Sequence, residues 1–386
     1  MNNSYNAGMA IDIKSIQIYL LFFLISFLFC YLSERMFSKK KKRLGFFLAV
    51  VSIFVLCLLA ALRSTKVGVD ISVYLLPNFN RATSYSDFLS FYSVASSQME
   101  LMFSLLVYEF AQLGNLSALF FTIQLLILLP IYIVLYRNCN NCSMTTAFII
   151  YVFLFYNFSL SGMRQSIAMS LVFLAIDYLM KSNYKKFVFW GCVAVLFHKG
   201  ALISLIVIAL IIIFENKKSY KRLLWCLAFI LLAFFAFYNQ FANLLAKLFW
   251  IINPRYSYYI VTYMSDGIQW GNIPTTEIVL KFGIVLVSIL FGHYRKKQNT
   301  RNISILAISL LGRYFVLLNA RMYEALRIAY YFDIFCITLA GKTVYQQKHQ
   351  ANRRIISIFL ILLAFLYWIY FIMYVGGYQT NVFTFV

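Results

Sequence analysis

The sequence predicts an all-α polytopic membrane protein in which the whole chain, residues 1–386, forms one integral membrane domain. Hydrophobic residues make up 63% of it and charged residues only 12%, whereas a soluble domain is about half apolar and about a quarter charged. Apolar segments that approach the roughly 20 residues needed to cross a bilayer recur along the chain. The net charge is +22, from 34 Lys and Arg against 12 Asp and Glu.

The positions of the basic residues decide what that charge means. In a soluble protein it would suggest a nucleic-acid partner. Here 22 of the 34 basic residues lie in six short stretches between apolar segments, accompanied only by Glu34 and Glu215. Cytoplasmic loops of membrane proteins collect Lys and Arg in this way, so we expect no nucleic-acid partner. The six stretches are 35–43, 137, 181–186, 217–222, 295–301 and 342–354.

Twelve apolar segments are predicted to form crossings: 16–32, 44–62, 117–136, 144–161, 165–180, 187–198, 201–214, 223–238, 277–292, 303–318, 328–341 and 355–375. From Lys181 onward the basic stretches are two segments apart, which places them on the cytoplasmic side and both termini outside. Segment 100–113 would break this alternation as a crossing, so it is predicted to be a re-entrant or interfacial helix with Glu100 near a cavity. The longest outer loops are 63–99 and 239–276.

Motifs for cofactors are weak or missing. Cys139 and Cys142 form a lone CxxC pair with no second pair and no nearby histidine, which is poor evidence for zinc. The chain has no GxxxxGK[ST], HExxH or GxSxG motif, and its predicted cytoplasmic loops are too short for a nucleotide-binding domain. We therefore expect neither a metal nor a nucleotide cofactor.

Two arginines stand out on the predicted outer side, where ionisable groups near the bilayer are functional candidates. Arg164 begins a helix after a very short connection, and a helix N-terminus with a guanidinium suits a phosphate. The alternative is an arginine that reaches lipid headgroups. Arg63 ends a segment and is followed by Gly68, Asp70 and Tyr74, which an ordinary interfacial loop with an aromatic-belt tyrosine would also explain.

His198 lies at the tip of a predicted short hairpin. Only 28 residues separate Lys186 from Glu215, whereas two full crossings need about 40. The tip, His198-Lys199-Gly200, would then lie about 18 Å from the cytoplasmic edge, inside the hydrocarbon depth. Water in an outward-opening cavity would solvate these side chains; the alternative is a buried histidine bonded to a neighbouring helix.

Three further arginines, Arg313, Arg321 and Arg327, lie near the last outer connection, against the positive-inside bias. Together with Arg63, Arg164 and His198 they predict an outward-facing cavity rich in arginine. Such a cavity suits a substrate with a lipid tail and an anionic head, for example a polyprenyl pyrophosphate.

Scattered short motifs resemble the EpsG-like family of bacterial polysaccharide polymerases, a branch of the Wzy-type O-antigen and capsule polymerases. The matching segments occur in the family's order and cover most of the chain. One departure is Leu101, which stands where the family usually has proline after the glutamate. The matching residues are Arg63, Gly68, Asp70 and Tyr74; Glu100 to Phe103; Gly162 to Ala168; Phe197 to Leu202; and Arg327 to Phe332.

The resemblance implies a GT-C-like membrane glycosyltransferase that uses no metal or nucleotide. Such enzymes polymerise undecaprenyl-pyrophosphate-linked repeat units at the outer face of the plasma membrane. Donor, acceptor and membrane lipid are the expected partners, with a chain-length-regulating membrane protein as a further candidate. We expect Arg164, supported by Arg327, Arg321 and Arg63, to bind the pyrophosphate, and His198, Asp70 or Glu100 to act as the base.

Two other functions fit the same inventory. A lipid-linked oligosaccharide flippase would also have about 12 crossings and a basic cavity, but it should show two repeat-related halves, and none is visible in the sequence. An O-antigen ligase would use the same donor with a lipid A core as acceptor, and only the resemblance separates it from a polymerase.

Overall fold

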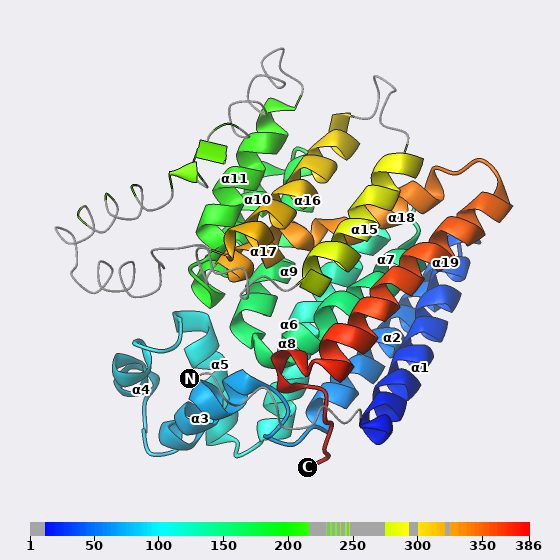
Figure 1. The fold of residues 1–386 in the computed structure, drawn as a ribbon. Coiled ribbons are helices and arrows are strands. Elements are labelled where there is room, and N and C mark those ends of the chain that lie inside the picture. The colour runs from blue at the N-terminus through cyan, green and yellow to red at the C-terminus, as the bar shows by residue number, and fades with distance from the viewer. Residues whose placement is uncertain are drawn as a thin grey trace.

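The computed structural model describes residues 12–215, 275–292, 300–320 and 325–386, with a few single positions between 229 and 247. Within these residues the regular structure is helical, and one isolated antiparallel bridge joins Arg63 to Phe385 (Figure 1). The first helices are α1 (Ile13–Ser38), α2 (Lys42–Ala61), α3 (Leu76–Ala82), α4 (Phe88–Ala95), α5 (Leu101–Gln112), α6 (Leu116–Arg137), α7 (Met144–Tyr151) and α8 (Asn157–Ser161). They are followed by α9 (Met163–Met180), α10 (Tyr184–Phe197), α11 (Ala201–Phe214), α15 (Thr275–Phe291), α16 (Thr300–Leu318), α17 (Ala325–Asp333), α18 (Phe335–Tyr345) and α19 (Gln350–Tyr367).

Six of the described helical segments are long and apolar enough to cross a membrane: Ile13–Ser38, Lys42–Ala61, Leu116–Arg137, Met144–Ser161, Met163–Met180 and Gln350–Tyr374. Four further apolar helices are shorter: Leu101–Gln112, Ala201–Phe214, Ile278–Phe291 and Asn302–Leu318. The predicted all-α class is confirmed for the described residues, and about 12 crossings stays a prediction. The predicted crossing 223–238 and the outer loop 239–276 fall largely outside the described residues.

Local sequence explains how the first hairpin forms. The Asp12 side chain accepts the backbone N–H of Lys14 at 3.2 Å, which satisfies one of the free donors at the start of α1. Lys40, in a left-handed conformation with φ of 60°, turns the chain into α2. Ser26 and Ser52 each donate to the other's carbonyl at 2.8 and 2.9 Å, so small hydroxyl residues join the two apolar helices.

Two predicted crossings depart from a single regular helix. Segment 144–161 is continuous but has a π-helical stretch at Val152–Tyr156, where an extra residue widens the turn between α7 and α8. Segment 328–341 is broken at Ile334 into α17 and α18. Asp333 ends α17 at this break and forms a buried ion pair with Arg313 of α16. An apolar count does not detect either departure.

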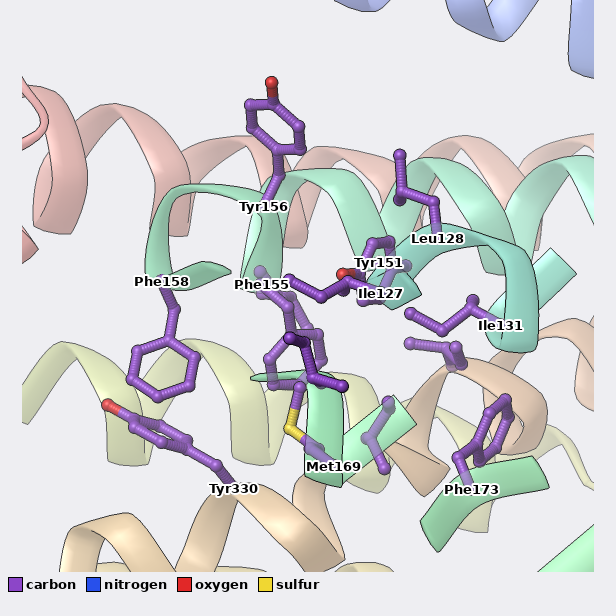
Figure 2. Packing of buried hydrophobic residues seen from close by; sticks show 14 of the residues in the cluster. Ile127, Leu128, Ile131, Tyr151, Phe155, Tyr156, Phe158, Met169, Phe173 and Tyr330 are labelled. Atoms are coloured by element: carbon purple, nitrogen blue, oxygen red, sulfur yellow. The ribbon is translucent and has the colours of Figure 1, made fainter. Parts of the chain in front are cut away.

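The core lies where α6, the α7–α8 rod and α9 meet. Nearly all side chains of α9 are buried, including Met169 and Phe173, and the buried residues lie on all faces of the helix. Figure 2 shows these residues beside Ile127 of α6 and Phe155 of the π-helical stretch. Because α9 is surrounded by other helices, its first turn is held at a defined place at one end of the bundle.

The last eleven residues, 376–386, fold back over that same end and are called here the C-terminal strap. The Tyr19 hydroxyl donates to the Thr380 carbonyl at 2.8 Å, and the Gly68 N–H donates to the Gln379 carbonyl at 3.1 Å. The strap therefore ties the start of α1 to the loop that follows α2.

Candidate functional site

Arg164 and Glu100 form the centre of a polar cluster at this end of the bundle. Nη1 of Arg164, in the first turn of α9, donates to Glu100 Oε2 at 2.8 Å and to the Gln98 carbonyl at 2.7 Å. The two side chains are 21% and 13% exposed, so the ion pair is largely shielded from water. The guanidinium lies over the Tyr74 ring, 4.3 Å from its centre, and Nε is buried with no hydrogen-bond partner in the described part of the chain.

Glu100 is held by the fold as well as by the arginine. It is the residue that precedes α5, and that helix, about 18 Å long at 1.5 Å per residue, is too short to cross a bilayer core of about 30 Å. This length fits the predicted non-crossing helix at 100–113. Oε1 of Glu100 accepts the backbone N–H of Lys199 at 3.4 Å, so both carboxylate oxygens have partners.

Asp70 joins the cluster through a tyrosine. It precedes a π-helical turn at Ile71–Leu75, and the Tyr74 hydroxyl donates to Asp70 Oδ2 at 3.0 Å. Burial raises the pKa of Asp70, while the hydrogen bond from Tyr74 and the charges of Arg164 and Arg327 oppose that shift. A carboxylate with a raised pKa is a better proton acceptor than a solvated one.

His198 reaches the cluster from the α10–α11 hairpin. The hairpin predicted from its length is present, with α10 ending at Phe197 and α11 beginning at Ala201. His198 Nδ1 and the Tyr331 hydroxyl of α17 are 2.9 Å apart. The hairpin tip also contacts Glu100 through the Lys199 N–H described above.

His198 is half-buried beside three charged side chains. The charges of Glu100, Arg164 and Arg327 act on its ring. A histidine that is neutral at pH 7 can accept a proton, which a histidine already protonated cannot.

Arg327 belongs to the same region. Its backbone carbonyl accepts Nε2 of Gln165 at 2.5 Å, which ties the start of α17 to the first turn of α9. Its charge acts on both Asp70 and His198. Arg164 and Arg327 therefore supply two positive charges to one set of proton-accepting side chains.

Arg63 lies beneath the cluster and has a different environment. Only 1% of it is exposed, and Nη1 donates to the Leu160 carbonyl at 2.6 Å. Its guanidinium also lies 4.3 Å from the centre of the Phe120 ring. Gly68 approaches the same carbonyl so closely that a Cβ would lie 2.7 Å from it, and its φ of 108° is unfavourable for other residues. Both residues support the turn from which Arg164 emerges.

The structure thus brings together Asp70, Glu100, Arg164, His198 and Arg327 from five separate segments of the chain. Arg63 lies below them, and Arg321 lies outside the described residues. Arg313 forms its ion pair with Asp333 at the end of α17, next to the break at Ile334.

The sequence did not indicate three parts of the site. Tyr331 lies in the family segment Arg327 to Phe332, but the sequence does not indicate that it contacts His198. Tyr74 belongs to a family motif and is also explained by an aromatic belt, and neither interpretation indicates that it bridges Asp70 and Arg164. Residues 376–386 carry no motif that indicates a role, and their contacts with Gly68 and Tyr19 connect the strap to the site.

Chemically, the arrangement can bind an anion beside a proton acceptor. Arg164 and Arg327 provide positive charge, and His198 and Asp70 provide lone pairs. Among the described residues no group of three or more His, Cys, Asp and Glu side chains is placed to hold a metal ion. Cys142 of the CxxC pair is buried, and its thiol faces the Thr338 carbonyl at 3.9 Å.

A family model described as the EpsG family matches residues 46–385, nearly nine-tenths of the chain. No curated protein and no solved structure matches it. The match spans all five segments that contribute to the cluster.

Proposed function

Because this chain belongs to the EpsG family, we propose that it is a membrane glycosyltransferase that polymerises undecaprenyl-pyrophosphate-linked oligosaccharide repeat units. Membership supports a polysaccharide polymerase in the membrane. The proposal adds about 12 crossings in a GT-C-like arrangement, and a site that faces the outside of the bacterial plasma membrane. The product would be O-antigen, capsule or exopolysaccharide.

The observation that carries this proposal is the way Arg164 is held. Nη1 is fixed by Glu100 and Gln98, and the planar face rests on Tyr74, so the guanidinium is oriented before any ligand arrives. Its buried Nε has no partner among the described residues. An oriented and partly exposed guanidinium suits a phosphate oxygen, and a fixed charge costs no reorganisation during reaction.

The reaction would proceed in one displacement. A hydroxyl of the acceptor repeat unit attacks the anomeric carbon of the donor, a new glycosidic C–O bond forms, and the bond to the pyrophosphate breaks. The electron pair of that bond leaves on undecaprenyl pyrophosphate, where Arg164 and Arg327 stabilise the charge, with Arg321 in support. The hydroxyl proton passes to a base.

His198 is the base that the contacts favour. If Nδ1–H donates to the Tyr331 oxygen, Nε2 carries the free lone pair and can take the proton. Asp70 is the second choice, because its pKa is raised but one oxygen already accepts from Tyr74. Both oxygens of Glu100 are engaged, so we now assign it to positioning Arg164. Arg63 supports the same arginine through the Leu160 carbonyl.

The partners of this reaction are the lipid-linked donor and acceptor and the surrounding lipid. A chain-length-regulating membrane protein is a further proposed partner. None of these steps requires a metal or a nucleotide.

A gene deletion followed by gel analysis of surface polysaccharide tests the function. A polymerase mutant makes single repeat units attached to core, a ligase mutant accumulates free polymer, and a flippase mutant shows no repeat at the outer face. Either of the last two patterns would contradict the proposal. In the complemented strain, Arg164→Ala and His198→Ala should abolish long chains at equal protein level, while Lys66→Gln, an exposed basic residue at the same end, should not.

A further inference from the structure

A cavity of about 650 Å³ lies at the opposite end of the bundle from the polar cluster. It is formed where α1 ends and where α7 and α19 begin, and α7 packs against both other helices. Because α2 runs from this end to Arg63, the cavity and the cluster are a full helix apart. In Figure 1 the start of α19 and the last turn of α18 lie at this end of the bundle.

The cavity is strongly basic. Four cationic residues line it, and Glu34 is its one acidic lining residue among those described. The Glu34 carboxylate is turned to the start of α7, where it accepts the N–H groups of Met144 and Thr145 at 2.8 and 2.9 Å and the Thr145 hydroxyl. It therefore caps a helix and pairs with none of the cations. The four cations are Arg35, Lys348, Arg353 and Arg354.

Two of the arginines are oriented by contacts that use only Nε. Arg35 Nε donates to the Tyr31 hydroxyl at 2.9 Å, and Arg353 Nε donates to the Gln347 carbonyl at 2.6 Å. Each guanidinium also lies near a tyrosine ring, at 5.2 and 5.3 Å from the centre. Their terminal nitrogens have no protein partner in the described part of the chain, and the same holds for the whole side chain of Arg354.

The cavity is also lined by hydroxyl groups, and on one side it opens onto an apolar face of α19. Thr146 of α7 and Ser357 of α19 are hydrogen-bonded at 2.8 Å and both line it. Ile358 also lines it, is 66% exposed, and continues into an apolar face of α19 that includes Ile355 and Leu362. A ligand with an anionic head and an apolar chain fits a basic cavity that borders an exposed apolar helix face.

We infer that this cavity binds a phosphoryl group, and specifically the headgroup of an anionic phospholipid whose acyl chain lies along α19. The positive-inside bias explains why basic residues occur at this end. It does not explain four of them around one cavity with hydroxyl donors and without an available carboxylate. Arginine ends that donate two parallel N–H groups are the usual protein ligands of a phosphate.

The test uses the purified full chain in nanodiscs of phosphatidylcholine with or without phosphatidylglycerol. Native mass spectrometry measures how much of each lipid the protein retains. Wild-type protein should retain phosphatidylglycerol at least tenfold over phosphatidylcholine. Arg354→Gln should lower that preference about tenfold, because one charge-assisted contact is lost. Its exposed side chain makes no hydrogen bond or ion pair with the described residues, so loss of folding does not account for the effect.

Lys39→Gln is the matched control, since it removes one exposed charge from the same end without touching the cavity. It should change the preference by less than about twofold if the site is specific. An equal loss in both variants, or no preference in the wild type, overturns the inference. Inorganic phosphate provides the second arm: displacement of the lipid at millimolar phosphate supports the same phosphoryl site with a soluble occupant. If phosphate does not displace it and Arg354→Gln does, the lipid headgroup is the ligand.

Discussion

Replacing Arg164 with lysine separates catalysis from folding at the candidate site. Lysine keeps the positive charge beside Glu100, so the ion pair can form again and no charge is left unpaired. It lacks the planar group that rests on Tyr74 and that can donate two parallel N–H groups to a phosphate. Arg164→Lys therefore removes the proposed phosphate contact and retains the charge.

The expected magnitudes differ between two substitutions. Loss of one donor to a developing negative charge costs about 10²–10³ in rate, or about 2.7–4 kcal/mol. With the charge retained, stability should change by less than about 1 kcal/mol. Arg164→Ala instead leaves Glu100, only 13% exposed, without its cation, and this should destabilise the fold by up to about 3 kcal/mol. Lysine is the more informative change because its folding effect is small.

The assay is polymer formation from lipid-linked repeat units by purified protein, followed by a chain-length gel in the complemented deletion strain. Arg164→Lys should lower the initial rate at least 100-fold at an unchanged melting temperature. Lys66→Gln serves as control for a charge change elsewhere at this end. A wild-type rate for Arg164→Lys at equal protein level would refute the assignment of Arg164 to the leaving group.

Three other predictions follow from the same contacts. If His198 is the base, protonation of its ring removes the free lone pair, so the rate should fall as the pH is lowered; a rate that does not change between about pH 8 and about pH 4 would contradict this. Tyr331→Phe removes the hydroxyl that contacts His198 Nδ1, so the rate should fall about tenfold while the KM for the acceptor is unchanged. An unchanged rate would show that Tyr331 has a packing role only. Gly68→Ala places a Cβ against the Leu160 carbonyl at an unfavourable φ and should lower stability by about 1–3 kcal/mol in a thermal-shift assay. Gly114→Ala is the control: its φ is also positive, but its Cβ would have no atom within 4 Å, so the loss should be clearly smaller.

The sequence predicts the fold class and most residues of the site, for separable physical reasons. Apolar length marks helices whatever their partners, so the helical class and the short α10–α11 hairpin could be predicted. An ionisable residue at membrane depth needs a polar partner, so Arg164 and His198 can be identified as candidates from the sequence. Local composition does not report which distant segment supplies that partner. Glu100 and Tyr331 are therefore joined to those residues only in the folded chain.

Arg63 and Arg164 illustrate what charge counting cannot separate. Both are arginines on the predicted outer side, at the end of an apolar segment, and both match a motif of the family, so the same reasoning assigns both to the pyrophosphate. In the structure Arg63 donates to the Leu160 carbonyl and is 1% exposed, whereas Arg164 follows the turn at Gly162 by two residues and its side chain is 21% exposed. The buried arginine thus holds the backbone that orients the partly exposed one. If this division is correct, Arg63→Lys should lower stability and the rate together, whereas Arg164→Lys lowers the rate alone. Equal melting temperatures for the two variants would mean that Arg63 does not hold the turn.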